Sequence, residues 1–262
     1  MAAHGEDARE EGRVVQIAYL DAMSEILAQV DAHETPAIRQ AAALAAAAIR
    51  ERHWVNMFGS GHSAIPALDA FPRYGSYVGF RPILDPRLLW HVPSGPGGAP
   101  ELLWIERQPG YIQNFLEDFT FVPGEVFIVY SHGGLNAAPV EAAQYAKDRG
   151  FPVVAVTSRQ NYMSRAPEHP SGKKLADLAD IVVDTHVPSQ DSLVQLERSA
   201  VPVAAGSTVA VVAITMAILA ETASILDRSG AVPPTFVSPN VQGVEAGHNA
   251  RVYEAYRAWR RG

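Results

Sequence analysis

The stretch Trp54-Val-Asn-Met-Phe-Gly-Ser-Gly-His-Ser63 joins a short apolar run to a glycine-rich turn. An apolar run of this length is typical of a buried strand, and a helical pattern follows the turn. Glycine lets the backbone turn tightly, and the first N–H groups of the next helix have no partner inside that helix. The stretch therefore predicts a strand, a tight turn and a helix, with hydrogen-bond donors gathered at the turn.

Three further apolar runs have the same character, namely Val126–Tyr130, Pro152–Val156 and Ile181–Val183. Helical patterns such as Pro139–Arg149 lie between them. Continuous apolar strands that alternate with helices indicate a parallel sheet covered on both faces. We therefore expect an α/β fold, a three-layer sandwich, in which ligands bind beyond the carboxyl ends of the strands.

Composition limits the partners of this chain. Of its 262 residues 48% are hydrophobic, enough for a packed core, and the net charge is −7. A general nucleic-acid binder needs clustered positive charge, so no nucleic-acid partner is expected. The absence of cysteine excludes disulfides and thiolate chemistry. The N-terminus has no secretory pattern, and proline and polar residues interrupt the apolar stretch Val201–Leu219. We expect a cytoplasmic protein with no membrane partner.

The chain divides into three parts by its patterns. Residues 1–12 are expected to be a mobile N-terminus, and residues 13–52 a pair of helices. Thr35-Pro36 separates the pair, because a threonine followed by proline is a helix start signal. Residues 53–262 form the α/β domain, including a C-terminal helix. Pro93–Pro100 is expected to be an exposed loop, and Arg159–Gly172 an irregular segment.

Three polar segments provide candidate ligand-binding residues. The first is Gly59, Ser60, Gly61, His62 and Ser63; the second is Ser131, His132, Gly133, Gly134 and Asn136; the third is Ser207 and Thr208. The third segment opens a long helix that is expected to run to about Leu226. Alternatives remain open, since the first segment can be a purely structural turn and Ser207 or Thr208 a simple helix cap.

The first segment also matches a dinucleotide-binding pattern. Gly59, Gly61 and Ala64 fit G-x-G-x-x-A, but the acidic residue expected about twenty positions later is missing, because Tyr77–Arg81 occupies its place. Arg81 would suit a 2′-phosphate. A dinucleotide oxidoreductase is thus a minor alternative.

The chain resembles the sugar isomerase (SIS) domain family, specifically its small phosphoheptose-isomerase-like branch, over about residues 12 to 260. The resemblance lies in the first segment and in Ile105–Arg107, Val122–Val126, Pro170–Lys173 and Ser238–Asn240. It implies a five-stranded parallel sheet, a phosphosugar or amino-sugar-phosphate ligand, and a homodimer or homotetramer. The second segment departs from the family pattern S-x-S-G-x-T, because Gly133 lacks the hydroxyl and Asn136 carries an amide.

Two residues are candidates for proton transfer. Glu106 follows the apolar run Leu102–Ile105, so a strand end or short turn is expected to present it as general base, and it resembles a glutamate of the family's etherase-like branch. The alternative is a surface salt bridge. His248 is the candidate general acid, with Asn249 as a ligand contact or a helix cap. The resemblance implies that these two act on a neighbouring subunit.

Other polar residues have simpler interpretations. Asp69 and Arg73 are spaced to pair on a helix, and Glu221, inside an apolar helix, must be paired or functional. The loop histidines lack metal-ligand spacing, and no cofactor or metal is expected.

The resemblance, together with these residues, therefore implies a sugar-phosphate isomerase that uses a carboxylate to remove a proton. A lyase or dehydratase acting by β-elimination on an amino-sugar phosphate is the first alternative. A non-catalytic sugar-phosphate sensor is the second.

Overall fold

A computed structural model describes residues 17–259 and contains a five-stranded parallel sheet with the order β2-β1-β3-β4-β5. The strands are β1 (Val55–Phe58), β2 (Phe80–Ile83), β3 (Val126–Tyr130), β4 (Val153–Thr157) and β5 (Ile181–Asp184). All four pairings are parallel. This confirms the predicted fold class.

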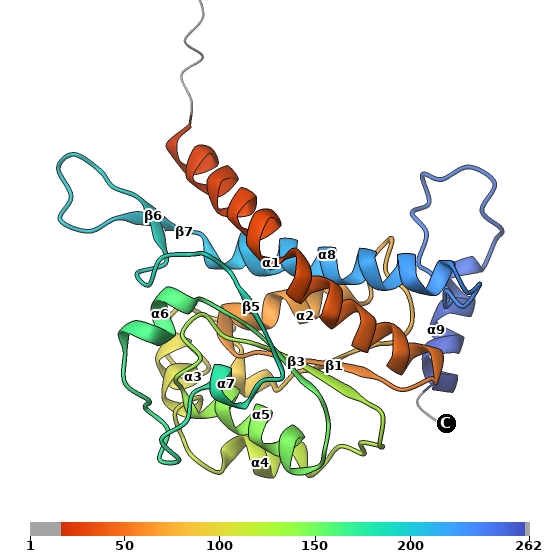
Figure 1. Ribbon diagram of the computed structural model, residues 1–262, viewed down its shortest axis with the longest axis horizontal. Helices are drawn as coiled ribbons and strands as arrows, with labels where there is room; N and C mark the ends of the chain where they lie inside the picture. The colour runs from red at the N-terminus through yellow and green to blue at the C-terminus, as the bar shows by residue number, and fades with distance from the viewer. Residues whose placement is uncertain (1–16, 260–262) are drawn as a thin grey trace, which may run out of the picture.

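Helices cover both faces of the sheet (Figure 1). On one side lie α1 (Ala18–Arg50), α2 (Ile65–Ala70), α8 (Ser207–Asp227) and α9 (His248–Trp259), and on the other α3 (Ala99–Ile105), α4 (Tyr111–Leu116), α5 (Ala137–Asp148) and α7 (Leu175–Leu178). Alternate residues of β3 point to the two layers. Ile128 and Tyr130 pack with α1 and α8, whereas Phe127 and Val129 pack with α4 and α5. All five β3 residues are buried, as expected for a strand covered on both faces.

The edge strand β2 has no apolar run that marks it in the sequence. Its residues are Phe-Arg-Pro-Ile, and only its first and last side chains are buried. Proline is tolerated here because an edge strand needs no second set of ladder hydrogen bonds.

The expected N-terminal helical pair is wrong: one helix, α1, runs through Pro36. Pro36 is exposed, so the helix needs to give up only a solvent-facing hydrogen bond at this position. Val30, Ile38 and Ala45 lie in the same buried cluster on both sides of the proline, and the packing of α1 on α8 holds the two halves in line. The expected mobile residues 1–12 lie outside the described residues.

The remaining elements are short: the 3₁₀ turns η1 (Gly61–Ala64) and η2 (Pro86–Leu88), the helix α6 (Arg159–Ser164), and the hairpin β6 (Ser192–Val194) with β7 (Val203–Ala205). The segment 159–172 thus begins with a helix rather than being irregular throughout. Ser158 accepts a hydrogen bond from the Asn161 backbone N–H at 3.2 Å and so caps it.

Helix α8 begins at Ser207 and ends at Asp227, close to the expected start at Ser207 or Thr208 and the expected end near Leu226. It is long and apolar enough to cross a membrane by length and composition, and 44% of its apolar window is buried. Core helices often meet this test, and α8 packs along α1 and α2.

Candidate functional site

The first loop, between β1 and α2, holds a tight turn at the carboxyl end of β1, the neighbour of the central strand β3. A Cβ atom on Gly59 would lie 2.0 Å from the Ser63 carbonyl oxygen, so only glycine fits. Gly61 has a φ of 57°, in the left-handed region that favours glycine. The Ser63 N–H donates to the Ser60 carbonyl at 3.0 Å and closes the turn. This turn presents Ser60 toward the end of α3.

Glu106 joins the first and second loops. It lies at the carboxyl end of the helix α3, not at the end of a strand, because Leu102 and Ile105 bury one helical face. Its Oε2 accepts the Ser60 hydroxyl at 2.7 Å, and its Oε1 accepts the Asn136 amide at 2.7 Å. The structure therefore brings three of the sequence-predicted site residues into direct contact.

The Glu106 carboxylate lies in a desolvated setting. The residue is 7% exposed, and burial raises the pKa of Glu106 above its ordinary value of 4.5. The Ser60 hydrogen bond and the Arg107 guanidinium, 3.9 Å from Oε1, oppose this rise, while the Glu168 carboxylate adds to it. A carboxyl with a raised pKa is a stronger base than an exposed one.

The second loop leaves backbone donors open at the start of α5. Gly134 has a φ of 62°, and its N–H donates to the Ser131 hydroxyl at 3.1 Å. Asn136 stands at the N-cap of α5, but its side-chain oxygen accepts no capping bond, and its amide N–H donates to Glu106 instead. Within residues 17–259 the N–H groups of Leu135, Asn136 and Ala137 meet no hydrogen-bond acceptor. Open N–H groups at a helix N-terminus are suited to an anion.

A pocket of about 240 Å³ opens beside these donors. Its polar lining comes from the second loop, from the residue after Glu106, and from α6 with the segment that follows it, and no residue of the first loop lines it. The lining includes Ser131, Gly133, Asn136, Arg107, Asn161, Arg165 and Glu168. The two arginines supply positive charge next to the start of α5. Such a lining fits a small, polar, anionic ligand.

Sequence reasoning missed four of these pocket residues: Arg107, Asn161, Arg165 and Glu168. Asn161 and Arg165 follow β4, the neighbour of β3, and the carboxyl ends of parallel strands meet at one edge. Their position directly after a predicted strand was the sequence feature that could have identified them as ligand-edge residues. The expectation that 159–172 is irregular gave no reason to place them at this edge.

The other loop residues have local partners. The His62 ring lies 4.5 Å from the Trp90 ring, and His132 Nε2 lies 3.3 Å from the Ser189 carbonyl oxygen. Ser131 and Gly133 line the pocket, whereas neither histidine does.

The start of α8 is occupied by the protein's own carboxylate. Asp191 Oδ1 accepts the Ser207 N–H at 2.8 Å, and its Oδ2 accepts the Ser207 hydroxyl at 2.9 Å. Asp191 therefore satisfies the donors that Ser207 was expected to offer a ligand. Neither Ser207 nor Thr208 lines the pocket described above.

His248 and Asn249 are not brought to Glu106 within one chain. His248 Nε2 lies 2.8 Å from the Thr235 carbonyl oxygen, and the Asn249 side chain pairs with both backbone groups of Val237. Their helix α9 packs on Trp54, at the amino end of β1, whereas the first loop follows the carboxyl end. Figure 1 shows α9 at the far end of the sheet from α3 and α6.

Two further carboxylates have ionic partners. Asp69 and Arg73 form the expected i, i+4 pair. Glu221 is half exposed and lies 3.7 Å from Arg39 of α1, so it is paired at the surface of two packed helices. Among residues 17–259 one group of three side chains, Glu34, Asp184 and His186, has ligand atoms close enough to hold a metal ion.

Comparisons with known proteins agree with this architecture. The family model for the SIS domain matches residues 18–158. The chain is 34% identical over 239 residues to a UPF0309 protein of Geobacillus kaustophilus, covering 91% of this chain and 93% of the relative. It is 33% identical over 243 residues to a UPF0309 protein of Thermoanaerobacter pseudethanolicus, covering 91% and 96%.

The fold is shared with a solved structure, the phosphoheptose isomerase of Neisseria gonorrhoeae, at a TM-score of 0.53 and 17% identity. The match covers 79% of this chain and 96% of the isomerase. With the five-stranded parallel sheet and the family match over 18–158, these relatives show that the chain belongs to the SIS-domain family and, within it, to the UPF0309 proteins.

Proposed function

We propose that this protein is a sugar-phosphate isomerase in which Glu106 is the general base. One observation carries the proposal: a buried carboxylate is held at 2.7 Å by one side chain from each of the two strand-end loops. Groups that shift protons at carbon are commonly carboxylates with raised pKa values in sites of this kind.

The ligand's phosphate would lie at the start of α5. The open N–H groups of Leu135, Asn136 and Ala137 and the guanidinium groups of Arg107 and Arg165 support this placement. The sugar carbonyl would then lie toward Asn136, the pocket residue whose side chain donates a hydrogen bond to Glu106.

The chemistry is a proton shift between adjacent carbons. Glu106 removes the proton from the carbon next to the carbonyl, and the bonding electrons form an enediolate. The hydroxyl proton on that first carbon passes to the former carbonyl oxygen, and the protonated Glu106 returns its proton to the former carbonyl carbon. Aldose and ketose thereby interconvert with no net gain or loss of atoms. Ser60 and Asn136 hold the carboxylate in place through both steps.

The test is Glu106→Gln, with Glu101→Gln as the matched control. Glu101 is an exposed carboxylate on the same helix, α3. A thermal-shift screen against phosphorylated hexoses, heptoses and N-acetylated amino sugars, with unphosphorylated counterparts, identifies the ligand. NMR in deuterated water then follows loss of the C2 proton. We expect exchange with the wild type and Glu101→Gln, and none with Glu106→Gln despite retained binding; unchanged exchange in Glu106→Gln would refute the assignment.

The same experiment separates the alternatives. A lyase acting on an amino-sugar phosphate starts with the same proton removal, so release of a substituent from the next carbon would favour that reaction. Binding without proton exchange would favour a sensor.

We also propose that the protein is a cytoplasmic homodimer or homotetramer. Apolar side chains are exposed together where α1, α8 and the β6–β7 hairpin meet, including Leu20 at 55%, Val201 at 65% and Val209 at 42%. A homo-oligomer is also what an action of His248 and Asn249 on a neighbouring subunit requires. Light scattering at micromolar concentration tests this, and a monomer would refute it.

A further inference from the structure

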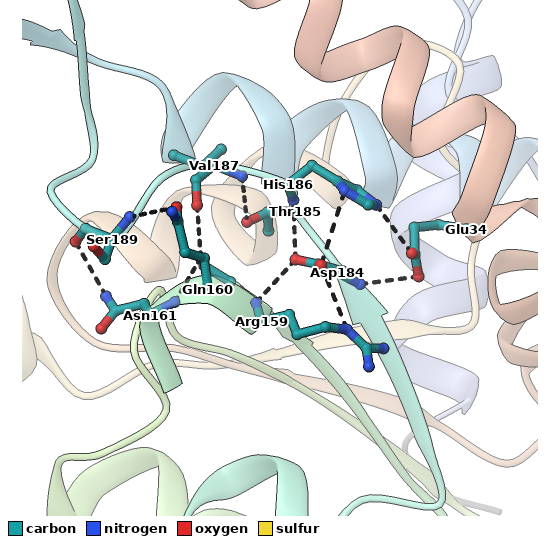
Figure 2. A network of polar contacts seen from close by, with 10 residues as sticks. Glu34, Arg159, Gln160, Asn161, Asp184, Thr185, His186, Val187 and Ser189 are labelled. Atoms are coloured by element: carbon teal, nitrogen blue, oxygen red, sulfur yellow. Dashed lines mark hydrogen bonds and ion pairs between the residues drawn. The ribbon is translucent and has the colours of Figure 1, made fainter. Parts of the chain in front are cut away.

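We propose that Glu34, Asp184 and His186 form a binding site for a first-row divalent metal ion. The three side chains lie at the carboxyl end of β5, outside the pocket (Figure 2). This inference stands apart from the proposed function, because it uses none of the residues assigned to the sugar phosphate.

The three ligands come from separate parts of the chain. Glu34 lies on α1 and is 7% exposed, while Asp184 is the last residue of β5 and is 5% exposed. His186 follows two residues later. Its backbone φ is 54°, in the left-handed region that residues other than glycine rarely adopt. The fold therefore maintains a strained backbone that places this imidazole between the two carboxylates.

Backbone donors orient both carboxylates. Glu34 Oε2 accepts the Asp184 N–H at 3.0 Å, and Asp184 Oδ1 accepts the N–H groups of Arg159 at 2.9 Å and His186 at 3.0 Å. One oxygen of each carboxylate is thereby engaged. Hydrogen bonds of this kind hold metal ligands in position in known metal sites.

The remaining oxygens face the imidazole. Glu34 Oε1 lies 3.0 Å from His186 Nε2, and Asp184 Oδ2 lies 3.9 Å from His186 Nδ1, as Figure 2 shows. Within residues 17–259 this is the one group of three whose ligand atoms all lie within 4.8 Å of one another. Small side-chain rotations would bring two oxygens and one ring nitrogen to a single ion.

Charge favours a cation at this place. Two buried carboxylates face one half-exposed positive group, the Arg159 side chain, whose Nε lies 3.6 Å from Asp184 Oδ2. Arg159 can move into solvent and make room for the ion. The His33 ring, 5.7 Å from the His186 ring on the exposed side of α1, is available as a further ligand.

The donor set selects the kind of metal. Two carboxylates and one imidazole suit Zn²⁺ or Mn²⁺ better than Mg²⁺ or Ca²⁺, which prefer oxygen alone. A bound ion would fasten α1 to β5. It would also hold the start of α6, because Asp184 accepts the first N–H of that helix.

The experiment is isothermal titration of the full chain, freed of metal by a chelator, with Zn²⁺ and Mn²⁺. We expect one high-affinity ion per chain. His186→Gln and Glu34→Gln should each weaken the affinity at least about tenfold. The matched control is His169→Gln, because His169 Nε2 also faces a buried glutamate, Glu141, at 3.4 Å but belongs to no three-ligand group within residues 17–259.

Zn²⁺-soaked crystals locate the ion directly by anomalous scattering, with a peak expected between Glu34 and His186. Circular dichroism checks that the variants fold. If Glu34→Gln does not fold, His186→Gln decides, because its side chain is 22% exposed. Absence of binding, wild-type affinity in His186→Gln, an equal loss in His169→Gln, or an anomalous peak elsewhere would each overturn the proposal.

Discussion

Asn136 donates its side-chain amide to Glu106 Oε1 at 2.7 Å, across 30 residues of sequence. The side-chain oxygen of Asn136, which could accept a backbone N–H at the start of α5, makes no capping bond there. One hydrogen bond thus orients the candidate base and leaves the helix N-terminus open for an anion.

The pH dependence of turnover follows from the environment of Glu106. Burial raises the pKa of Glu106, and the base must be ionised to accept a proton, so kcat/KM should fall on the acid side at a pH above 4.5. Ser60→Ala removes a hydrogen bond that lowers this pKa, so its acid limb should move to higher pH. A profile that Ser60→Ala leaves unmoved would contradict the assignment.

The same raised pKa predicts how stability changes with pH. Folding favours the protonated carboxyl, so its stabilising contribution is complete below the unfolded pKa near 4.5 and is lost as pH rises through the folded value. The Glu106→Gln variant has no ionisable group at this position, so its free energy of unfolding does not fall in this way as pH rises. Urea unfolding at about pH 4 and about pH 7 should therefore show Glu106→Gln gaining stability relative to the wild type at the higher pH.

Gly133→Ser should strengthen binding of a phosphorylated ligand. The added Cβ would have Asn161 Nδ2 as its nearest neighbour, at 3.4 Å, so the residue fits without rearrangement. A hydroxyl bonded to a charged group contributes about 1.5–3 kcal/mol, which corresponds to about tenfold or more in Kd. Titration calorimetry measures this. A gain of the same size for an unphosphorylated sugar would place the phosphate elsewhere.

Gly59→Ala should destabilise the protein by about 1–3 kcal/mol, because its Cβ would overlap the Ser63 carbonyl oxygen. Gly133→Ala is the matched control, since it meets only ordinary contacts in the other loop. Denaturant unfolding compares the two. Equal stability of both variants would mean that the first loop adjusts freely.

Asp191→Asn should reduce stability by about 0.5–1 kcal/mol, because it removes a negative charge from the N-terminus of α8. Ligand affinity should stay unchanged, since Asp191 does not line the pocket. Thermal unfolding with and without ligand measures both quantities. A changed affinity would return the start of α8 to the binding site.

Local patterns in the sequence were sufficient for much of the fold. Buried parallel strands are continuously apolar, so β1, β3, β4 and β5 were evident, as were the two glycine loops and α8. The edge strand β2 was not, because Arg81 and Pro82 interrupt its apolar pattern. The continuity of α1 was also hidden, because proline is a local stop signal that packing against α8 overrides.

The site was partly evident for the same reason. Polar, glycine-rich segments after strands mark a ligand edge, so the sequence by itself indicated Ser60 and Asn136 as candidates. Glu106 was indicated by the apolar run Leu102–Ile105 before it and by the family resemblance. Only the tertiary structure decided that these three touch, that Asp191 closes the start of α8, and that Glu34 meets His186 across 152 residues. Such partners are far apart in the chain, and chain topology, rather than any local pattern, determines which side chains share a dry environment.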